Sequence, residues 1–399
     1  MSGVISDNTV TSSGAIAPVT SATTDANNPA VDTNPTDGVG TKWINTTSGQ
    51  IFICIDATTD ENEWIGQTIS SIQPRCFFSG GNSDYLGEHN WSYVVKINDI
   101  TFVTPDTLGD AVSFGVLTET NQYFCGTSNG VNDRGVFGGG AASASPTNVI
   151  QYFTCSTSGN CIDFGNLDVA RVQAGACSNG TTDRACWSGG GETGTDVASN
   201  VIDYITISTT GNATDFGNLI NTKEYTSALS NGTNDRGINA GGIDNGGSPH
   251  LNEIDYWTIS TTGNAQDFGN LTNTIMAPAT ASNDTDNRGL FMAGNYGGSY
   301  SDKIDYITIS STGNAADFGD MDGADMGYGQ GSARGHCAGN SSGLGQRGML
   351  GGGYSSGGGV SNWYKDIRYV TISTTGNGAF FGNLSKRVYG PASCDNTFV

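Results

Sequence analysis

The stretch Val201–Leu219, VIDYITISTTGNATDFGNL, recurs along the chain and decides its fold. Its first half is rich in β-branched and aromatic residues, which favours a strand with apolar side chains on both faces. The polar run STTGN follows, and we expect a tight turn there in which Gly211 takes a positive φ. The chain then re-enters an extended segment that ends at Leu219. Each copy of this unit is therefore predicted to be one β-hairpin.

Close copies of the unit cover 149–167, 253–271, 303–321 and 366–384, and a degraded first copy covers 99–117. The pattern Arg-x-x-x-x-Gly-Gly, or a close variant, precedes each hairpin, and a strand of small residues precedes most of these patterns. Four strands in each period of about 50 residues are typical of the blades of a β-propeller. The sequence therefore predicts an all-β fold.

One blade-length unit reads Arg171…Ser178-Asn179-Gly180, Cys186-Trp187-Ser188-Gly189-Gly190, Ile202-Asp203-Tyr204 and Asp215–Leu219. At these residues the chain resembles the kelch type of propeller, and the resemblance covers roughly 75–399. It implies a six-bladed β-propeller. Phe of DFGNL stands where kelch blades usually carry Trp, so the term kelch-like describes the chain better.

The two ends of the repeat region complement each other. The unit 75–117 lacks a small-residue strand ahead of its Gly-Gly strand, whereas an unpaired strand of this kind remains at 387–399. We therefore expect 387–399 to add the innermost strand to the blade built from 75–117. This pairing would close the ring of six blades and remove an exposed sheet edge.

The composition limits the possible partners. The chain has 399 residues, 60 Gly, 14% charged residues and a net charge of −22, which indicates a loop-rich β protein. No apolar stretch approaches the roughly 20 residues that span a bilayer, so membrane insertion is not expected. The negative charge disfavours nucleic acid, which requires clustered Lys and Arg. The beginning of the chain lacks the features of a secretory signal, so synthesis in a host cytoplasm is expected.

The N-terminal region divides into two parts. Residues 1–40 are almost all polar or small, which predicts a flexible or extended arm. Residues 41–70 are expected to form a β-meander with strands at Trp43-Ile44, Gln50–Ile55 and Trp64-Ile65. The segment GTKWINTTSGQIFICIDATTD resembles a motif near the front of many tail-fibre and appendage proteins of tailed phages. The resemblance implies an attachment module; the alternative is a hairpin that caps the propeller.

The sequence offers weak candidates for chemistry. We expect no catalytic residues, no cofactor and no metal, because the three His share no ligand spacing and the repeated Asp-Phe-Gly is structural. Asn283–Asn287 has alternating oxygen ligands but lacks the bidentate Glu of a calcium loop. The nine Cys are expected to be buried thiols, with a disulfide between Cys155 and Cys161 as an alternative.

Arginine recurs once in each repeat, and these six residues account for a large part of the 16 basic residues. Their periodicity predicts a structural ring, with Asp163, Asp215, Asp267 and Asp317 as candidate partners. An anion-binding ring is the alternative. The six are Arg75, Arg134, Arg184, Arg236, Arg288 and Arg347.

The loops ahead of the hairpins vary most and would lie on one face, where binding usually resides. Their aromatic residues are the candidate contacts to a glycan or a neighbouring protein, with plain loop packing as the alternative. These residues are Tyr85, Trp91, Tyr354, Trp363 and Tyr364.

These features together predict a non-enzymatic virion structural protein of a tailed phage, in a tail fibre or tail appendage. Residues 1–70 would attach to other virion proteins, and the propeller would bind the host surface or another subunit, with several copies in each particle. A capsid decoration protein is one alternative, and a carbohydrate-binding or glycosidase-type propeller is another. A glycosidase would need a convergent carboxylate pair, whereas the acids here mostly follow the repeat.

Overall fold

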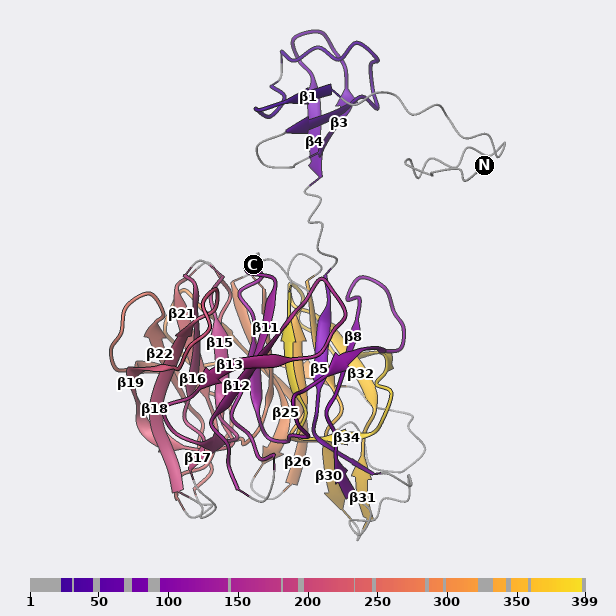
Figure 1. Cartoon of the computed structure of the whole chain (residues 1–399). Coiled ribbons are helices and arrows are strands. Elements are labelled where there is room, and N and C mark those ends of the chain that lie inside the picture. The colour runs from indigo at the N-terminus through magenta and orange to yellow at the C-terminus, as the bar shows by residue number, and fades with distance from the viewer. Residues whose placement is uncertain are drawn as a thin grey trace. The chain divides into compact units, whose positions relative to one another are not determined.

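The computed structural model describes residues 23–30, 32–45, 51–67, 74–84, 94–142, 145–180, 182–192, 197–232, 234–245, 249–283, 287–296, 299–321, 333–341, 346–357 and 360–396. These residues form strands, turns and bends, and none of them lies in an α-helix. The chain divides into two compact units, Met1–Ile72 and Gln73–Val399. Figure 1 shows both units, and each is described here by itself. The protein is therefore all-β.

The first unit is a four-stranded sheet in the order β1-β2-β3-β4. Strands β2 (Lys42–Asn45), β3 (Ile51–Asp56) and β4 (Glu63–Gln67) pair antiparallel in succession, as the expected meander requires. The fourth strand, β1 (Thr23–Asp25), pairs parallel to β2. It belongs to the segment 1–40, which was predicted to be a flexible or extended arm, so part of that arm is strand.

The second unit contains six successions of four antiparallel strands, and one of these belongs to a larger, six-stranded sheet. They are numbered here as sheets 1 to 6. Sheet 1 is β35 (Ala392–Asp395), β5 (Cys76–Ser79), β8 (Asp99–Val103) and β9 (Val112–Val116); sheet 2 is β10 (Cys125–Thr127), β11 (Arg134–Gly138), β12 (Val149–Thr154) and β13 (Ile162–Asn166); sheet 3 is β15 (Gly175–Ser178), β16 (Arg184–Ser188), β18 (Val197–Thr206) and β19 (Thr214–Lys223). Sheet 4 is β20 (Ser227–Leu229), β21 (Arg236–Ala240), β22 (Glu253–Thr258) and β23 (Gln266–Asn270); sheet 5 is β24 (Ala279–Asn283), β25 (Arg288–Tyr296), β26 (Ser299–Thr308) and β27 (Ala316–Asp320); sheet 6 is β28 (Ala338–Ser341), β29 (Arg347–Gly351), β32 (Asp366–Thr371) and β33 (Ala379–Asn383).

The C-terminal strand belongs to the first sheet. Strand β35 pairs antiparallel with β5, so that Ala392 is opposite Ser79 and Asp395 is opposite Cys76. This pairing between the two ends of the repeat region is the one that the sequence predicts. It covers the edge of β5 that would otherwise carry unpaired backbone groups.

The first strands of the six sheets neighbour one another in a closed cycle, because β35 contacts both β10 and β28. Six hydrophobic clusters fill the spaces between neighbouring sheets. Phe77 and Phe153, for example, come from sheets 1 and 2, and their ring centroids lie 4.8 Å apart. Burial of such side chains stabilises each junction by roughly 1.5–3 kcal/mol per side chain. The sheets therefore share their cores with both neighbours.

The outer hairpins carry the repeated motif and one shared irregularity. In sheet 3, Ile202 pairs with Gly217 and Asp203 with Asp215, so Phe216 occupies a bulge. The same shift in register occurs in all six hairpins. Phe216 is 2% exposed and packs in the core between sheets 3 and 4. The bulge thus explains why every copy keeps Phe-Gly at this point.

Each outer hairpin also binds the turn of the next sheet, a contact termed here the rim latch. Between sheets 2 and 3, Gly211 N donates to Phe164 O and Ala213 N to Asn166 O, both at 2.8 Å. In return, Asn166 N donates to Oδ1 of Asn212 at 3.1 Å. Equivalent amide-to-side-chain bonds join all six neighbouring pairs, the last from Asn383 N to Asp110 Oδ1.

The expected positive φ at Gly211 in the turn is wrong. Gly211 does not have a positive φ. The turn closes earlier, where Thr209 N donates to Thr206 O at 3.2 Å, and Gly211 lies between this turn and β19. The positive φ occurs instead at the glycine of the opposing Phe-Gly pair, where Gly165 has φ 150°.

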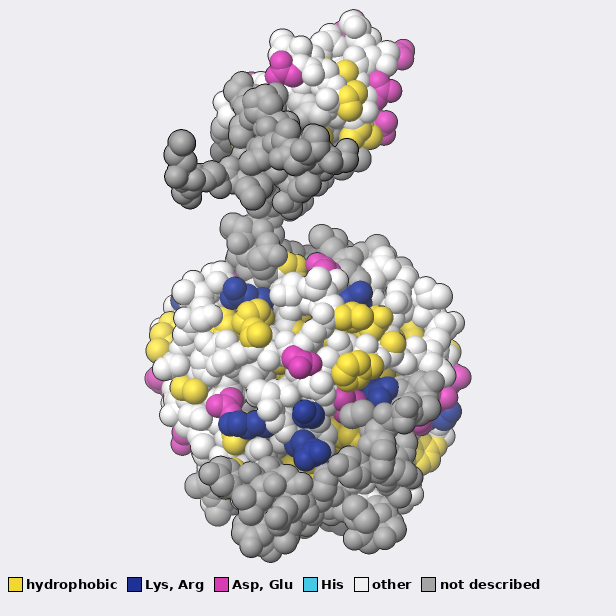
Figure 2. All heavy atoms as spheres, turned by 90° about the vertical axis from the view of Figure 1, so that its right-hand side faces the viewer, with side chains coloured by type: hydrophobic (Ala, Val, Ile, Leu, Met, Phe, Trp, Pro, Cys, Tyr) yellow, Lys and Arg dark blue, Asp and Glu magenta, His cyan; other side chains and the backbone are white. Residues whose placement is uncertain are grey.

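The outer surface of the second unit carries hydrophobic, polar and charged side chains together. On the side that carries β8 and β32, hydrophobic side chains form separate groups among polar and basic ones (Figure 2). Exposed large apolar residues on outer strands include Val112, Ile162 and Phe380. In the described part of the chain, no helix has the length and apolar character needed to cross a membrane.

Candidate functional site

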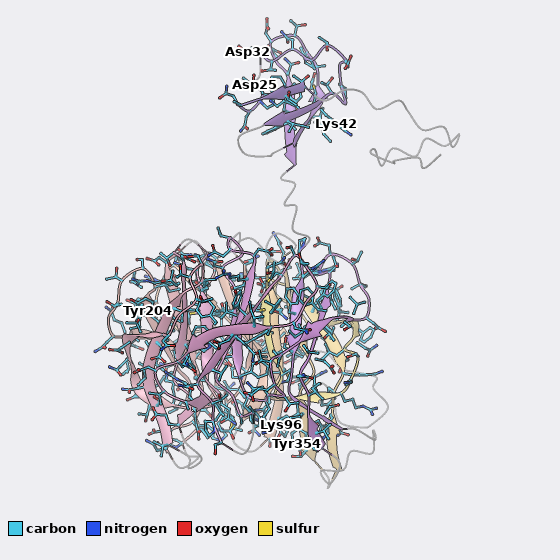
Figure 3. All side chains as sticks on the ribbon, in the orientation of Figure 1. Asp25, Asp32, Lys42, Lys96, Tyr204 and Tyr354 are labelled. Atoms are coloured by element: carbon cyan, nitrogen blue, oxygen red, sulfur yellow. The ribbon has the colours of Figure 1, made fainter. Side chains whose placement is uncertain are left out.

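The variable insertions gather at one end of the second unit, where the first strand of each sheet begins. They form short strands of their own there: β6 (Asn82–Asp84), β7 (Val94–Lys96), β17 (Gly191–Glu192), β30 (Tyr354–Gly357) and β31 (Val360–Trp363). Strand β34 (Val388–Tyr389), which leads into β35, pairs with β6. Figure 3 shows Tyr354 and Lys96 at this end and Tyr204 away from it. This end of the second unit is called the insertion end below.

A ring of six residues with left-handed backbone lies at the insertion end, one just before each first strand. Their φ angles lie between 50° and 65°, and only one of the six is glycine. Such backbone costs a non-glycine residue about 1–3 kcal/mol and persists where the surrounding structure imposes it. The six are Tyr123, Gln173, Tyr225, Ala277, His336 and Gly390.

Main-chain hydrogen bonds join this ring into a closed cycle. Each bond runs from an amide in one segment to the carbonyl of the preceding segment, for example Ala277 N to Tyr225 O at 2.6 Å and Gln173 N to Tyr123 O at 2.8 Å. The cycle closes where Tyr123 N donates to Gly390 O at 3.1 Å. In the bond to Gln173 O, the donor is Thr226 rather than Tyr225. These bonds fix the backbone that presents the side chains of this end.

Aromatic side chains cluster on this ring around His336. The imidazole lies 4.9 Å from the ring of Tyr389, 5.3 Å from Tyr225 and 5.9 Å from Tyr123, all edge-to-face. Burial lowers the pKa of His336 to about 4, so its ring is neutral at pH 7. Burial also raises the pKa of the Tyr123 and Tyr389 hydroxyls. Tyr123, Tyr225 and Tyr389 remain partly exposed as whole residues.

The aromatic residues that the sequence singled out lie behind this cluster or outside the described residues. Tyr354 and Trp363 are buried, and both rings pack against Tyr389, at 5.2 and 5.5 Å. Tyr364 is buried, and its ring lies 4.2 Å below the guanidinium of Arg334. Tyr85 and Trp91 fall outside the described residues. The burial of these three residues favours the alternative of loop packing, and their contact with a ligand stays a prediction.

The six repeated arginines join neighbouring sheets, but through partners other than the expected aspartates. Arg134 donates to the carbonyl of Ile207 in the next sheet at 2.7 Å and lies 4.6 Å over the ring of Tyr152 in its own sheet. All six make an equivalent pair of contacts. Among the described ion pairs, none joins these arginines to Asp163, Asp215, Asp267 or Asp317.

The bulge in each outer hairpin explains why the repeated arginines do not pair with these aspartates. Asp163 and its counterparts pair across the hairpin at a position that points to solvent, whereas the arginine side chain runs along the tyrosine towards the next sheet. Each of the six guanidinium groups thus places at least one of its N–H donors on a carbonyl of the next sheet and one face on an aromatic ring. These contacts favour the structural ring, and the anion-binding alternative stays a prediction.

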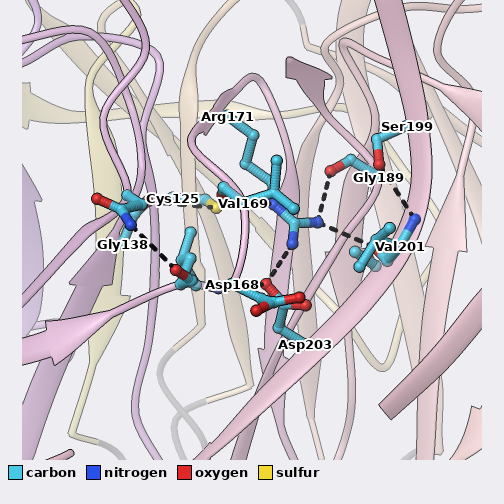
Figure 4. A network of polar contacts seen from close by, with 12 residues as sticks. Cys125, Gly138, Asp168, Val169, Arg171, Gly189, Ser199, Val201 and Asp203 are labelled. Carbon is cyan, nitrogen blue, oxygen red and sulfur yellow. Dashed lines mark hydrogen bonds and ion pairs between the residues drawn. The ribbon is translucent and has the colours of Figure 1, made fainter. Parts of the chain in front are cut away.

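Buried ion pairs also fasten the segments that connect the sheets. Arg171 donates to Gly189 O at 3.1 Å, to Val201 O at 2.9 Å and to the carboxylate of Asp203 (Figure 4). Both side chains of this pair are fully buried. Arg334 forms the same kind of contact with Asp366, through two bonds of 2.8 and 2.7 Å. Burial raises the pKa of Asp203, whereas at Asp366 the neighbouring Arg334 and Arg368 outweigh burial and lower the pKa.

The cysteines are free thiols, and the Cys155–Cys161 disulfide is not formed. Both residues are buried in the core between sheets 1 and 2. Cys177 is opposite Cys186 just as Leu229 is opposite Ile238 in the next sheet, so these thiols occupy apolar positions of the repeat. Most of Asn283–Asn287 lies outside the described residues. Within the described part, no group of three or more His, Cys, Asp or Glu is placed to hold a metal ion.

Comparison of the chain with models of known protein families gave no match, and a search of curated proteins gave none either.

The aromatic cluster could not be predicted from the sequence repeats. Tyr123, Tyr225, His336 and Gly390 share one structural position, but their side chains differ so much that no pattern marks it. The available signal was the spacing, because each of the six residues lies two positions ahead of a small-residue strand. Only the closed cycle of sheets brings these distant positions together at one end.

Proposed function

We propose that the second unit is a six-bladed β-propeller of kelch-like type, and that the protein is a non-enzymatic virion structural protein of a tailed phage, in a tail fibre or tail appendage. The propeller assignment is supported by the six four-stranded successions, their closed cycle and the six shared cores. The kelch-like Arg recurs in every sheet, and Gly-Gly recurs in all but sheet 5, where Ala293 replaces the first Gly.

One observation carries the functional proposal: the repeated polar groups are used to fasten neighbouring sheets. The arginine contacts and the rim latch recur at all six junctions, so the conserved part of the repeat is scaffold. What varies between sheets lies at the insertion end. A rigid scaffold with one variable end is suited to presenting a binding surface.

The first unit would serve for attachment. Its sheet carries the motif that resembles phage appendage proteins, and Trp43 and Trp64 form an edge-to-face pair 6.0 Å apart on it. So small a sheet gains stability when it packs against another protein. We therefore assign contacts with other virion proteins to residues 1–70, with several copies in each particle.

The recognition surface would be the aromatic cluster at the insertion end. Tyrosine offers a large rigid ring together with a hydroxyl, which suits both glycans and protein surfaces. Tyr123, Tyr225 and Tyr389 supply such groups around His336. The partner would be a host-surface glycan or protein, or a neighbouring subunit.

Antibody labelling of purified virions tests the location. Antibody raised against residues 75–399 should label the tail. Label over the head would instead support a capsid decoration protein, and unlabelled particles would exclude both assignments.

A substitution in the cluster tests the recognition surface. Tyr225→Asn removes one ring, and Asn tolerates the left-handed backbone of this position. We expect assembled particles that adsorb to host cells at least tenfold more slowly. Phe380→Ser, on the outer strand β33, is the matched control and should adsorb normally. Normal adsorption by the Tyr225→Asn particles would remove the cluster from the proposal.

A further inference from the structure

One of the six rim latches contains an Asn-Gly pair. The side chain that accepts the latch bond follows the glycine of the turn, and it is an asparagine in five of the six latches. Cysteine follows Asn160, and alanine follows the next three of these asparagines. Only Asn377, in the latch between sheets 5 and 6, is followed by a glycine, Gly378. Glycine has no side chain, so its backbone nitrogen can approach the preceding residue closely.

The Asn-Gly pair is the sequence in which a backbone nitrogen most readily attacks the preceding side-chain amide. In this reaction Gly378 N forms a bond to Cγ of Asn377, the Cγ–Nδ2 bond breaks, and ammonia leaves with the proton of Gly378 N. Water then opens the resulting five-membered succinimide at one of its two carbonyls. One opening gives aspartate. The other gives isoaspartate, whose main chain runs through the side chain and is one carbon longer.

In the closed latch, both reacting groups bind the backbone of Asp320 in sheet 5. Asn377 Oδ1 accepts from Asp320 N at 3.1 Å, and Gly378 N donates to Asp320 O at 2.8 Å. The attacking nitrogen is therefore engaged as long as the latch is closed. Asn377 is exposed, so water reaches its side chain. A local opening of the latch would release the nitrogen and the side-chain amide together.

Three other Asn-Gly pairs are buried. Asn129, Asn179 and Asn231 are at most 2% exposed. Oδ1 of each accepts from the backbone amide three residues further along, at 3.0–3.3 Å. Burial keeps water and base away from these side chains, so they should react slowly in the folded protein. In a fifth pair, the glycine that follows Asn245 lies outside the described residues.

We infer that Asn377 is a site of spontaneous deamidation, and that the reaction is gated by the opening of the latch between sheets 5 and 6. The aspartate product keeps a suitable acceptor, since Asp110 accepts from Asn383 N at 2.9 Å in the equivalent latch. The isoaspartate product does not fit, because its extra carbon displaces Gly378 N from Asp320 O. Deamidation to isoaspartate therefore makes a reversible opening of this junction permanent. This inference does not rest on the proposed function.

Mass spectrometry of the folded full chain tests the site. The protein is aged at mildly alkaline pH in H₂¹⁸O, because hydrolysis of the succinimide then places one heavy oxygen in the product and distinguishes it from deamidation during digestion. The tryptic peptide 369–386 contains Asn377. Asn377 should react faster than Asn129, Asn179 and Asn231, by about tenfold or more, and give both aspartate and isoaspartate. Equal rates at the four positions would overturn the proposal.

Gly319→Ala tests the gate. A Cβ atom on Gly319 would lie 2.5 Å from Gly376 O, so this variant should keep the latch between sheets 5 and 6 open and speed the reaction at Asn377 about fivefold or more. Gly165→Ala is the matched control. It should open the latch between sheets 2 and 3, where alanine follows Asn212, and leave the rate at Asn377 unchanged. The same rate at Asn377 in both variants would overturn the gating.

Hydrogen exchange of the wild-type protein gives a second test of the gate that does not depend on a variant. Urea below the unfolding transition should speed the exchange of the Gly378 amide and the deamidation of Asn377 by the same factor, because both require the same opening. Faster exchange at Gly378 with an unchanged rate of deamidation would overturn the gating.

Discussion

The carbonyl oxygen of Gly211 lies 2.2 Å from the position that a Cβ atom on Gly165 would take. The two residues belong to neighbouring sheets, so the glycine of Phe-Gly is required by the turn of the next repeat. The same relationship recurs at the other rim latches, for example between Gly217 and Gly263 at 2.4 Å. The repeated Thr-Gly-Asn and Phe-Gly-Asn are therefore two halves of one contact.

Gly165→Ala should open the latch between sheets 2 and 3. Gly165 has φ 150°, a conformation that side chains rarely adopt, and its Cβ would also collide with the backbone of Gly211. We expect a loss of about 2 kcal/mol or more in the free energy of unfolding. Urea unfolding followed by fluorescence measures the change.

Gly211→Ala is the matched control from the other half of the latch. No atom lies within 4 Å of the position of its Cβ, and its φ is not positive. Its stability should stay within about 0.5 kcal/mol of the wild type. Equal losses in the two variants would contradict the asymmetry described here.

The sequence predicted most of the second unit because its copies can be compared with one another. Six hairpins, the Gly-Gly strands and the pairing of 387–399 with the first sheet all follow from counting strands per repeat. The partners of the repeated arginines could not be predicted in this way. Charge periodicity pointed to aspartates, whereas the carbonyl of Ile207 is invisible in a side-chain pattern.

Arg171→Met should destabilise the protein by about 3 kcal/mol, because it leaves the carboxylate of Asp203 buried without its partner. Burial already raises the pKa of Asp203, and removing the guanidinium would raise it further. The loss should therefore be greater at pH 8 than at pH 5. Urea unfolding at both values checks the magnitude and the trend.

The double variant Arg171→Asn with Asp203→Gln is the control for the buried pair. Sheet 2 uses Asn121 and Gln151 at the corresponding positions, where Gln151 accepts from Thr118 N at 2.8 Å. The double variant should recover at least half of the loss and show no difference between pH 5 and pH 8. A double variant as unstable as Arg171→Met would show that the charge is not the cause.

Arg236→Met should weaken the junction between sheets 4 and 5. Arg236 donates to Ile309 O at 2.8 Å and lies 4.9 Å over the ring of Tyr256. Removing both contacts should cost about 1–3 kcal/mol. Lys303→Met removes an exposed ion pair with Asp320 and should cost less than about 1 kcal/mol. Similar losses for both would contradict the role of the repeated arginines.

The candidate site was harder to predict than the fold, for a physical reason. Tyr225 and His336, which we propose as part of the recognition surface, occupy a position held by main-chain hydrogen bonds, and the side chain at this position differs from sheet to sheet. Tyr354 and Trp363 were predicted as contact residues because they are loop aromatics, whereas in the structure both are buried against Tyr389. Sequence can locate variable segments, but the choice between packing and presentation depends on three-dimensional neighbours.

His336 should make the protein less stable in mild acid. Burial among Tyr123, Tyr225 and Tyr389 lowers its pKa to about 4, below the ordinary value of 6.5, so between these values the unfolded chain binds the extra proton. Stability should therefore fall as the pH drops below 6.5, and the loss from this residue should be complete near pH 4. The loss is on the order of 3 kcal/mol, because each pKa unit corresponds to about 1.4 kcal/mol.

His336→Asn is the control for this titration, because Asn tolerates φ 56° and carries no group that titrates in this range. Urea unfolding between pH 4 and pH 7 should give parallel curves for the two proteins above pH 6.5 and a shallower decline for His336→Asn below it. Equal slopes across the whole range would show that His336 is not the buried titrating group.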